Sequence, residues 1–168
     1  SNARNGFIYC GITHFCLYIL HRIANNIISL SGQFLVMNSR IYKEVHFDAS
    51  HRLLHYKGKC ANLHGHRWKV EVWIDGAVDN DTCILIDYNT IKNIVERFDH
   101  QILLNRDDPM VPCIGQFQPV ITTPGDPTSE LLAVLSRDMI VEECNAPGRE
   151  IKVTKLRVWE SPTCYAEI

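Results

Sequence analysis

Three histidines and one cysteine are the residues best suited to chemistry in this sequence. The stretch CANLHGHRW, residues 60–68, holds Cys60, His64 and His66, and His51 precedes it. Neutral imidazoles are good zinc ligands, and a catalytic zinc site takes three protein ligands while keeping a fourth position open. The sequence therefore predicts a Zn²⁺ site formed by His51, His64 and His66.

Two predicted strands place these histidines on one face of a sheet. Residues 40–50 and 66–75 each alternate between apolar and polar side chains, as half-buried strands do. His51 continues the apolar side of the first strand, and His64 and His66 continue that of the second. Residues two apart on a strand point the same way, so both rings can reach one ion. Gly65 leaves the opposite face uncrowded. The apolar positions are Ile41, Val45, Phe47, Ala49, Trp68, Val70, Val72 and Ile74.

These residue types leave other interpretations open at this point. The histidines could be hydrogen-bonded strand ends without a metal, although three converging imidazoles are hard to satisfy without a cation. Cys60 could be a fourth ligand that closes a structural site, a small buried residue, or a reactive thiol near Lys57 and Lys59.

The remaining pattern predicts an α+β fold. Residues 83–87 are expected to form a short buried strand, and Asp87 or Asn89 to cap a helix that ends near Asp99. Residues 105–125 hold four prolines and no period, which indicates a long loop. Asp126 is the expected cap of a second helix, followed by strands over residues 151–160 and from about residue 164. Two strands, two helices and two strands indicate an antiparallel sheet with helices on one face.

Composition limits the classes of function. The 168 residues are 46% hydrophobic and 21% charged with a formal charge of −2, so we expect one globular domain without a nucleic-acid or membrane partner. Seven scattered cysteines without a CxxC pair are typical of a reducing compartment and predict a cytoplasmic protein.

The N-terminal part is expected to lie outside the domain. Residues 1–3 resemble the remnant of a cleaved expression tag, and residues 4–38 are predicted to be an extension with some helical character. Met37 is a plausible native start, and residues 39–168 are expected to form the single domain.

Six segments follow one another in an order that identifies a family. They are FDASHRL (47–53), CANLHGH (60–66), ILIDYNTIK (84–92), RFDHQILLN (97–105), DPTSELLA (126–133) and VWESPTCYAE (158–167). Together they resemble the 6-pyruvoyltetrahydropterin synthase and 6-carboxytetrahydropterin synthase family. The resemblance implies a tunnelling fold, with an antiparallel four-stranded sheet and two helices on one face in the order ββααββ. It also implies a homohexamer, a dimer of trimers with active sites at subunit interfaces.

The resemblance also implies roles for individual residues. His51, His64 and His66 would bind zinc, Cys60 would be the catalytic thiol, and Asp99 with His100 would complete a proton relay. Glu160 would anchor the pterin by accepting two parallel hydrogen bonds, with help from Thr128 and Ser129. Arg52, Lys57, Lys59 and Arg67 are candidates for holding a triphosphate by proximity only.

The spacing between Cys60 and His64 bears on the product. Three residues intervene, as in the 6-carboxytetrahydropterin synthases of queuosine (7-deazapurine) biosynthesis, whereas the pyruvoyl enzymes usually have five. The implied reaction is that of a carbon–carbon lyase: 7,8-dihydroneopterin triphosphate gives 6-carboxy-5,6,7,8-tetrahydropterin, acetaldehyde and triphosphate. The alternatives are a 6-pyruvoyltetrahydropterin synthase, a non-catalytic zinc and pterin-binding module, and a zinc hydrolase. The hydrolase would explain neither Cys60 nor Glu160.

Overall fold

The computed structural model describes residues 37–145 and 150–168. The predicted tag remnant and nearly all of the predicted extension, residues 4–38, lie outside these ranges. In chain order the elements are β1 (Asn38–His51), η1 (Lys59–Ala61), β2 (His64–Ala77), α2 (Tyr88–Val95), η2 (Glu96–Phe98), β3 (Gln101–Asn105), α3 (Met110–Ile114), β4 (Ile121–Thr123), α4 (Ser129–Cys144), β5 (Ile151–Ser161) and β6 (Cys164–Glu167). No helix within the described ranges is both long and apolar enough to cross a membrane.

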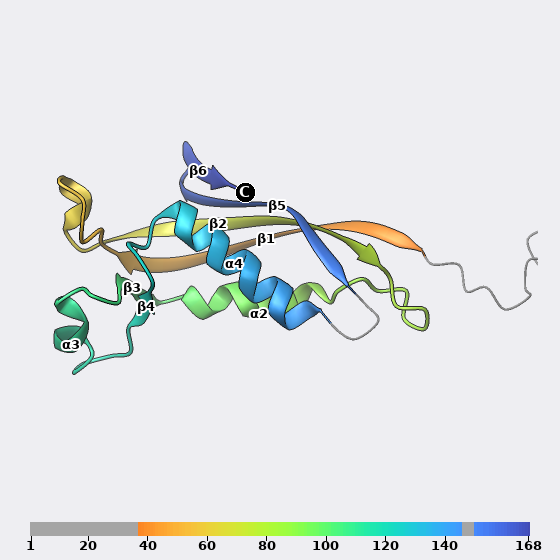
Figure 1. Cartoon of the computed structure of the whole chain (residues 1–168), viewed down its shortest axis with the longest axis horizontal. Helices are drawn as coiled ribbons and strands as arrows, with labels where there is room; N and C mark the ends of the chain where they lie inside the picture. The colour runs from red at the N-terminus through yellow and green to blue at the C-terminus, as the bar shows by residue number, and fades with distance from the viewer. Residues whose placement is uncertain (1–36, 146–149) are drawn as a thin grey trace, which may run out of the picture. The chain divides into compact units, whose positions relative to one another are not determined.

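The strands form one sheet in the order β4-β3-β1-β2-β5-β6. Its antiparallel part is β1, β2, β5 and β6, which are the four strands that the sequence predicts. The short strands β3 and β4 were not predicted, and they extend the sheet in parallel beside the end of β1. Figure 1 shows α2 and α4 against one face of this sheet. The α+β fold with helices on one face is therefore confirmed, with two more strands than expected.

The core lies between the sheet and these two helices. The alternation in β1 and β2 has the predicted parity. Val45, Phe47 and Ala49 are buried on β1, and every second residue from Trp68 to Ile74 is buried on β2. Burying these side chains on one face fixes the register of the two strands, because a one-residue slip would expose all of them. The helices contribute Ile91, Ile94, Val95, Leu132, Ala133 and Ile140.

Three local predictions need correction. Residues 83–87 form no strand, because Cys83 has a left-handed φ of 57° inside a turn, although Leu85 and Ile86 are buried as expected. The segment 105–125 contains α3 and β4 rather than only loop. Asp126 does not cap α4; the hydroxyl of Thr128 does, accepting from the Leu131 amide at 3.3 Å.

The helix before β3 agrees with its predicted start. The Asp87 carboxylate caps α2 by accepting a hydrogen bond from the Asn89 amide at 2.8 Å. The helix tightens into η2 and ends at Asp99, and the chain then turns sharply at His100, whose φ is 57°. A non-glycine residue in the left-handed region is strained, so this turn holds His100 in an uncommon backbone conformation.

Candidate metal centre

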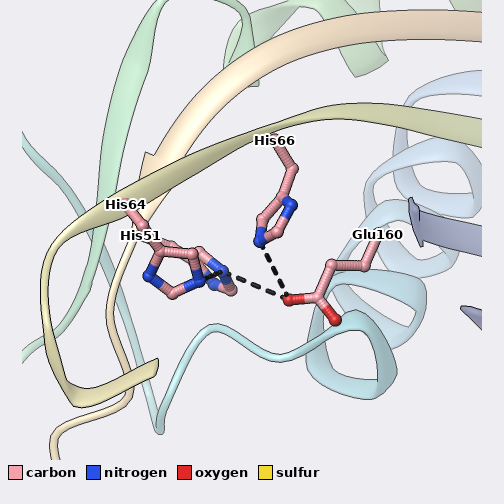
Figure 2. A group of neighbouring side chains, drawn as sticks. All are labelled: His51, His64, His66 and Glu160. Carbon is pink, nitrogen blue, oxygen red and sulfur yellow. Dashed lines mark hydrogen bonds and ion pairs between the residues drawn. The ribbon is translucent and has the colours of Figure 1, made fainter. Parts of the chain in front are cut away.

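The end of the β1–β2 ladder brings three histidines together. His51 and His64 face each other as the last pair of the antiparallel register, and His66 lies opposite Ala49. All three point to the side of the sheet that the alternation predicts, and Figure 2 shows their rings converging. Gly65 lies between His64 and His66, where an added Cβ would come within 3.3 Å of the Ser50 hydroxyl. The sequence-predicted set is thus assembled by strand geometry alone.

Backbone carbonyls fix which ring nitrogens carry hydrogen. His51 Nδ1 lies 2.8 Å from the Pro127 carbonyl oxygen, and His64 Nδ1 lies 2.8 Å from that of Asn62. Because a carbonyl only accepts, both rings must donate from Nδ1, and in the neutral rings both Nε2 atoms carry lone pairs. These two lone pairs face each other at 3.1 Å. Only a cation or an added proton relieves that arrangement.

Glu160 joins the three histidines from β5. Its Oε1 lies 3.3 Å from Nε2 of His51 and 3.3 Å from Nε2 of His66. The ligand atoms of all four residues lie within 4.8 Å of one another. Donors bound tetrahedrally to zinc at about 2.0 to 2.1 Å are roughly 3.3 Å apart, so this spacing suits such an ion. The sequence predicts the position of Glu160 on the inward parity of its strand but assigns it to the pterin rather than to this cluster.

Burial disfavours a protonated cluster. The His51 side chain is fully buried, and burial lowers its pKa more than the Pro127 carbonyl raises it. Burial likewise lowers the pKa of His66, whose Nε2 is buried and makes no hydrogen bond despite the nearby carboxylate. The buried Trp68 ring packs edge-on against the His51 and His66 rings and forms an apolar floor. Neutral imidazoles with an unpartnered nitrogen fit a divalent metal ion.

Asp99 and His100 form a hydrogen-bonded pair at the neighbouring strand end. His100 Nδ1 lies 2.9 Å from Asp99 Oδ2, and Asp99 Oδ1 accepts from the Asp48 amide at 2.8 Å. The amide of His100 donates to the Asp48 carbonyl at 2.7 Å, which fastens the turn to β1. These bonds from Asp48 and His100 hold the pKa of the Asp99 carboxyl below its ordinary value. His100 and His66 line one hollow, which also includes Arg67 and Gln118.

Cys60 lies outside the histidine cluster. It sits half-buried on η1, and its carbonyl accepts a hydrogen bond from the Leu53 amide at 2.9 Å. In the part of the chain that the structure describes, the group able to hold a metal includes Glu160 and not Cys60. The interpretation of Cys60 as a fourth ligand therefore has no support from the geometry.

Four basic residues near the site differ in how they are paired. Arg52 forms an ion pair at 2.7 Å with Asp108, whose side chain is fully buried. Arg67 lies 3.4 Å from the exposed Asp48 carboxylate. Lys57 is exposed on the loop after β1, and Lys59 is exposed at the start of η1. Arg52 thus has a structural partner and is the weakest of the four candidates for binding an anion.

A second hollow also includes His66. It is lined by both His66 and Glu160, together with Trp159, Lys69 and His46. Thr128 and Ser129 are at the start of α4, directly after the Pro127 carbonyl that contacts His51. His66 thus lines both hollows, and Glu160 lines one of them.

Comparison with known proteins gives consistent matches over the described domain. The family model described as 6-pyruvoyl tetrahydropterin synthase matches residues 40–168. A 6-carboxy-5,6,7,8-tetrahydropterin synthase of Rickettsia felis is 29% identical over 136 residues, covering 75% of this chain and 96% of its own. The synthase of the same name from Aquifex aeolicus is 29% identical over 159 residues, covering 78% and 98%. The solved 6-pyruvoyl tetrahydropterin synthase of Caenorhabditis elegans, 22% identical, superposes with a TM-score of 0.55 over 81% of this chain and 98% of its own. The tunnelling fold is thereby confirmed.

Proposed function

Because this chain belongs to the 6-pyruvoyl tetrahydropterin synthase family, we propose that it is a zinc-dependent 6-carboxy-5,6,7,8-tetrahydropterin synthase. Its substrates would be 7,8-dihydroneopterin triphosphate and one water molecule, and the other products acetaldehyde and triphosphate. Two observations support the carboxy branch: relatives carry that name, and three residues separate Cys60 from His64. The product would serve queuosine biosynthesis in the cytoplasm.

The histidine cluster is the observation that carries the proposal. His51, His64 and His66 would hold the zinc ion through their Nε2 atoms, which converge at a partly buried strand end. When bound, the ion would lower the pKa of the side-chain hydroxyls of the substrate and stabilise the negative charge that develops on them. The apolar floor at Trp68 would strengthen this electrostatic effect by excluding water on that side.

Glu160 has two possible tasks, and we assign it the pterin. A catalytic metal site keeps an open position, which a carboxylate bound permanently as a fourth ligand would close. A carboxylate at the edge of the hollow can instead accept two parallel hydrogen bonds from the 2-amino group and adjacent ring N–H of the pterin. Thr128 and Ser129 would support the ring from the start of α4.

Proton transfer falls to Cys60 and to the Asp99–His100 pair. Asp99 orients His100 by accepting from Nδ1, which leaves Nε2 in the open hollow to take or give a proton. The Cys60 thiolate would move protons between the substrate side chain and the ring. In the described part of the chain its thiol forms no hydrogen bond with His66 or His100, and we propose that the site is completed between subunits of a homohexamer.

The charged tail of the substrate requires cations that have no buried partner. Lys57, Lys59 and Arg67 fit this requirement, since they are exposed or weakly paired. Arg52 does not, because Asp108 neutralises it. We therefore propose that the triphosphate lies on the Lys57 side of the histidine cluster.

Product identification tests the proposal. Zinc-loaded protein is incubated with 7,8-dihydroneopterin triphosphate, and the pterins are separated and identified by mass spectrometry. We expect 6-carboxytetrahydropterin. Pyruvoyltetrahydropterin would instead assign the alternative synthase activity, and bound but unchanged substrate would assign a non-catalytic pterin-binding module.

A further inference from the structure

The buried ring of His51 is held by a contact far away in the sequence. Its Nδ1 donates to the carbonyl oxygen of Pro127, which is 76 residues further along the chain and just before α4. This hydrogen bond selects the tautomer whose Nε2 lone pair faces His64 and Glu160. The availability of that lone pair therefore depends on where the backbone at Pro127 is held.

The neighbouring carboxylate of Asp126 fixes that backbone to two other segments. Asp126 Oδ1 accepts from the Asn105 side-chain amide at 2.8 Å, at the end of β3. Its Oδ2 accepts from the backbone amide of His55 at 2.8 Å, and the His55 ring lies 3.2 Å from Oδ1. The Asp126 side chain is only 16% exposed, so these bonds are largely shielded from water.

The His51 segment is consequently attached at two points to the same dipeptide. His51 contacts the Pro127 carbonyl, and His55, four residues later, contacts the Asp126 carboxylate. Burial alone would raise the pKa of Asp126, but the bonds from Asn105 and His55 outweigh burial and keep the carboxylate ionised. Charge-assisted hydrogen bonds of this kind are stronger than neutral ones and restrict movement of the joined segments.

We propose that Asp126 is a positioning residue for His51. It holds the Pro127 carbonyl in the place where that carbonyl fixes the His51 tautomer and directs Nε2 toward the other histidines. The inference rests on the proposed function in taking His51 as a metal ligand. Asp126 is not among the residues that line the two hollows, and it acts on His51 through the Pro127 backbone and through its hydrogen bond to the His55 amide. Partners that orient a metal-bound imidazole typically contribute about 10- to 100-fold to metal affinity.

The test compares Asp126→Ala and Asp126→Asn with Asp138→Ala, a matched control on the exposed side of α4. Zinc affinity is measured by competition with a chelator, and the His51 tautomer by nitrogen-15 NMR of the metal-free protein. We expect Asp126→Ala to bind one zinc ion with about 10- to 100-fold lower affinity and to gain the Nε2–H tautomer. Asp126→Asn keeps one acceptor, so its zinc affinity and its His51 tautomer ratio should lie between those of Asp126→Ala and the unaltered chain. Asp138→Ala should match the unaltered chain in both quantities.

Two outcomes would overturn the proposal. Unchanged zinc affinity and tautomer in Asp126→Ala, with only a lower free energy of unfolding, would make Asp126 a structural link alone. An equal loss of zinc affinity in Asp138→Ala would show that the effect is not specific to Asp126. If Asp126→Ala does not fold, Asn105→Ala removes one of the same hydrogen bonds and must shift both readouts in the same direction. Failure of the unaltered chain to bind zinc would refute the metal site, whereas the tautomer of the metal-free protein still tests Asp126.

Discussion

His66 Nε2 and Glu160 Oε1 lie 3.3 Å apart, just beyond Lys69 and Trp159, the last paired residues of β2 and β5. This proximity places the proposed pterin anchor directly beside a proposed metal ligand. The two strands separate at this point, and a hollow lined by both residues opens between them. Substrate recognition and metal binding are thus proposed to meet at one break in the sheet.

Replacement of His66 and replacement of Glu160 are predicted to have different effects. His66→Ala should lower the affinity for zinc by more than roughly 100-fold. That is the largest effect expected from removing a residue that only orients a ligand. Glu160→Ala should keep zinc bound and raise KM for the pterin. His46→Ala, on the exposed face of β1, is the matched control for metal content. Metal analysis and steady-state kinetics measure both effects, and zinc loss in Glu160→Ala would make Glu160 a ligand instead.

Removing the thiol of Cys60 is predicted to stop turnover without removing the metal. Cys60→Ala should lower kcat by about 100-fold or more, the usual contribution of a positioned proton-transfer group, while zinc content stays at one per chain. Cys83→Ala changes an exposed cysteine and should leave both quantities unchanged. Unaltered kcat in Cys60→Ala would remove the thiol from the mechanism.

Asp99→Asn is predicted to disorient His100 while leaving the protein folded. The amide can still accept from the Asp48 backbone but can present its NH₂ group to the His100 ring, which favours the wrong tautomer. We expect kcat to fall by about 100-fold with little change in zinc affinity. A rate equal to that of the unaltered chain would show that His100 needs no orienting carboxylate.

The buried ion pair between Arg52 and Asp108 is predicted to stabilise the fold rather than to bind substrate. Asp108→Ala leaves the Arg52 guanidinium without its partner, removes the acceptor of the Met110 amide, and should lower the free energy of unfolding by about 3 kcal/mol. Asp75→Ala removes a pair of similar length with the exposed Arg40, and it should have a much smaller effect. Denaturant unfolding of both variants provides the comparison, and equal effects would refute the distinction.

The sequence predicts how the three histidines are grouped better than it predicts the edge of the sheet. Strand alternation is a strong local signal, so β1 and β2, with His51, His64 and His66 at their ends, follow directly from it. Strands β3 and β4 are short and pair in parallel with distant segments, which gives no local period. The apparent strand at residues 83–87 has apolar residues but no partner.

Contacts made by the backbone are the least visible in a sequence. The carbonyls of Pro127 and Asn62 select the tautomers of His51 and His64, yet any residue type carries a carbonyl. Asp126 was predicted as a helix cap because aspartate before proline is typical of one, but its carboxylate bonds to Asn105 and His55 instead. Parity could have placed Glu160 beside the histidines, since it extends the inward side of β5.

The stoichiometry of the released products distinguishes the carboxy reaction from the pyruvoyl reaction. Zinc-loaded protein is allowed to consume a known amount of 7,8-dihydroneopterin triphosphate, and acetaldehyde and triphosphate are both quantified. We expect one acetaldehyde for each triphosphate, because cleavage of the side chain accompanies loss of the triphosphate tail. Triphosphate without acetaldehyde would contradict it and would assign the chain to the pyruvoyl branch of its family.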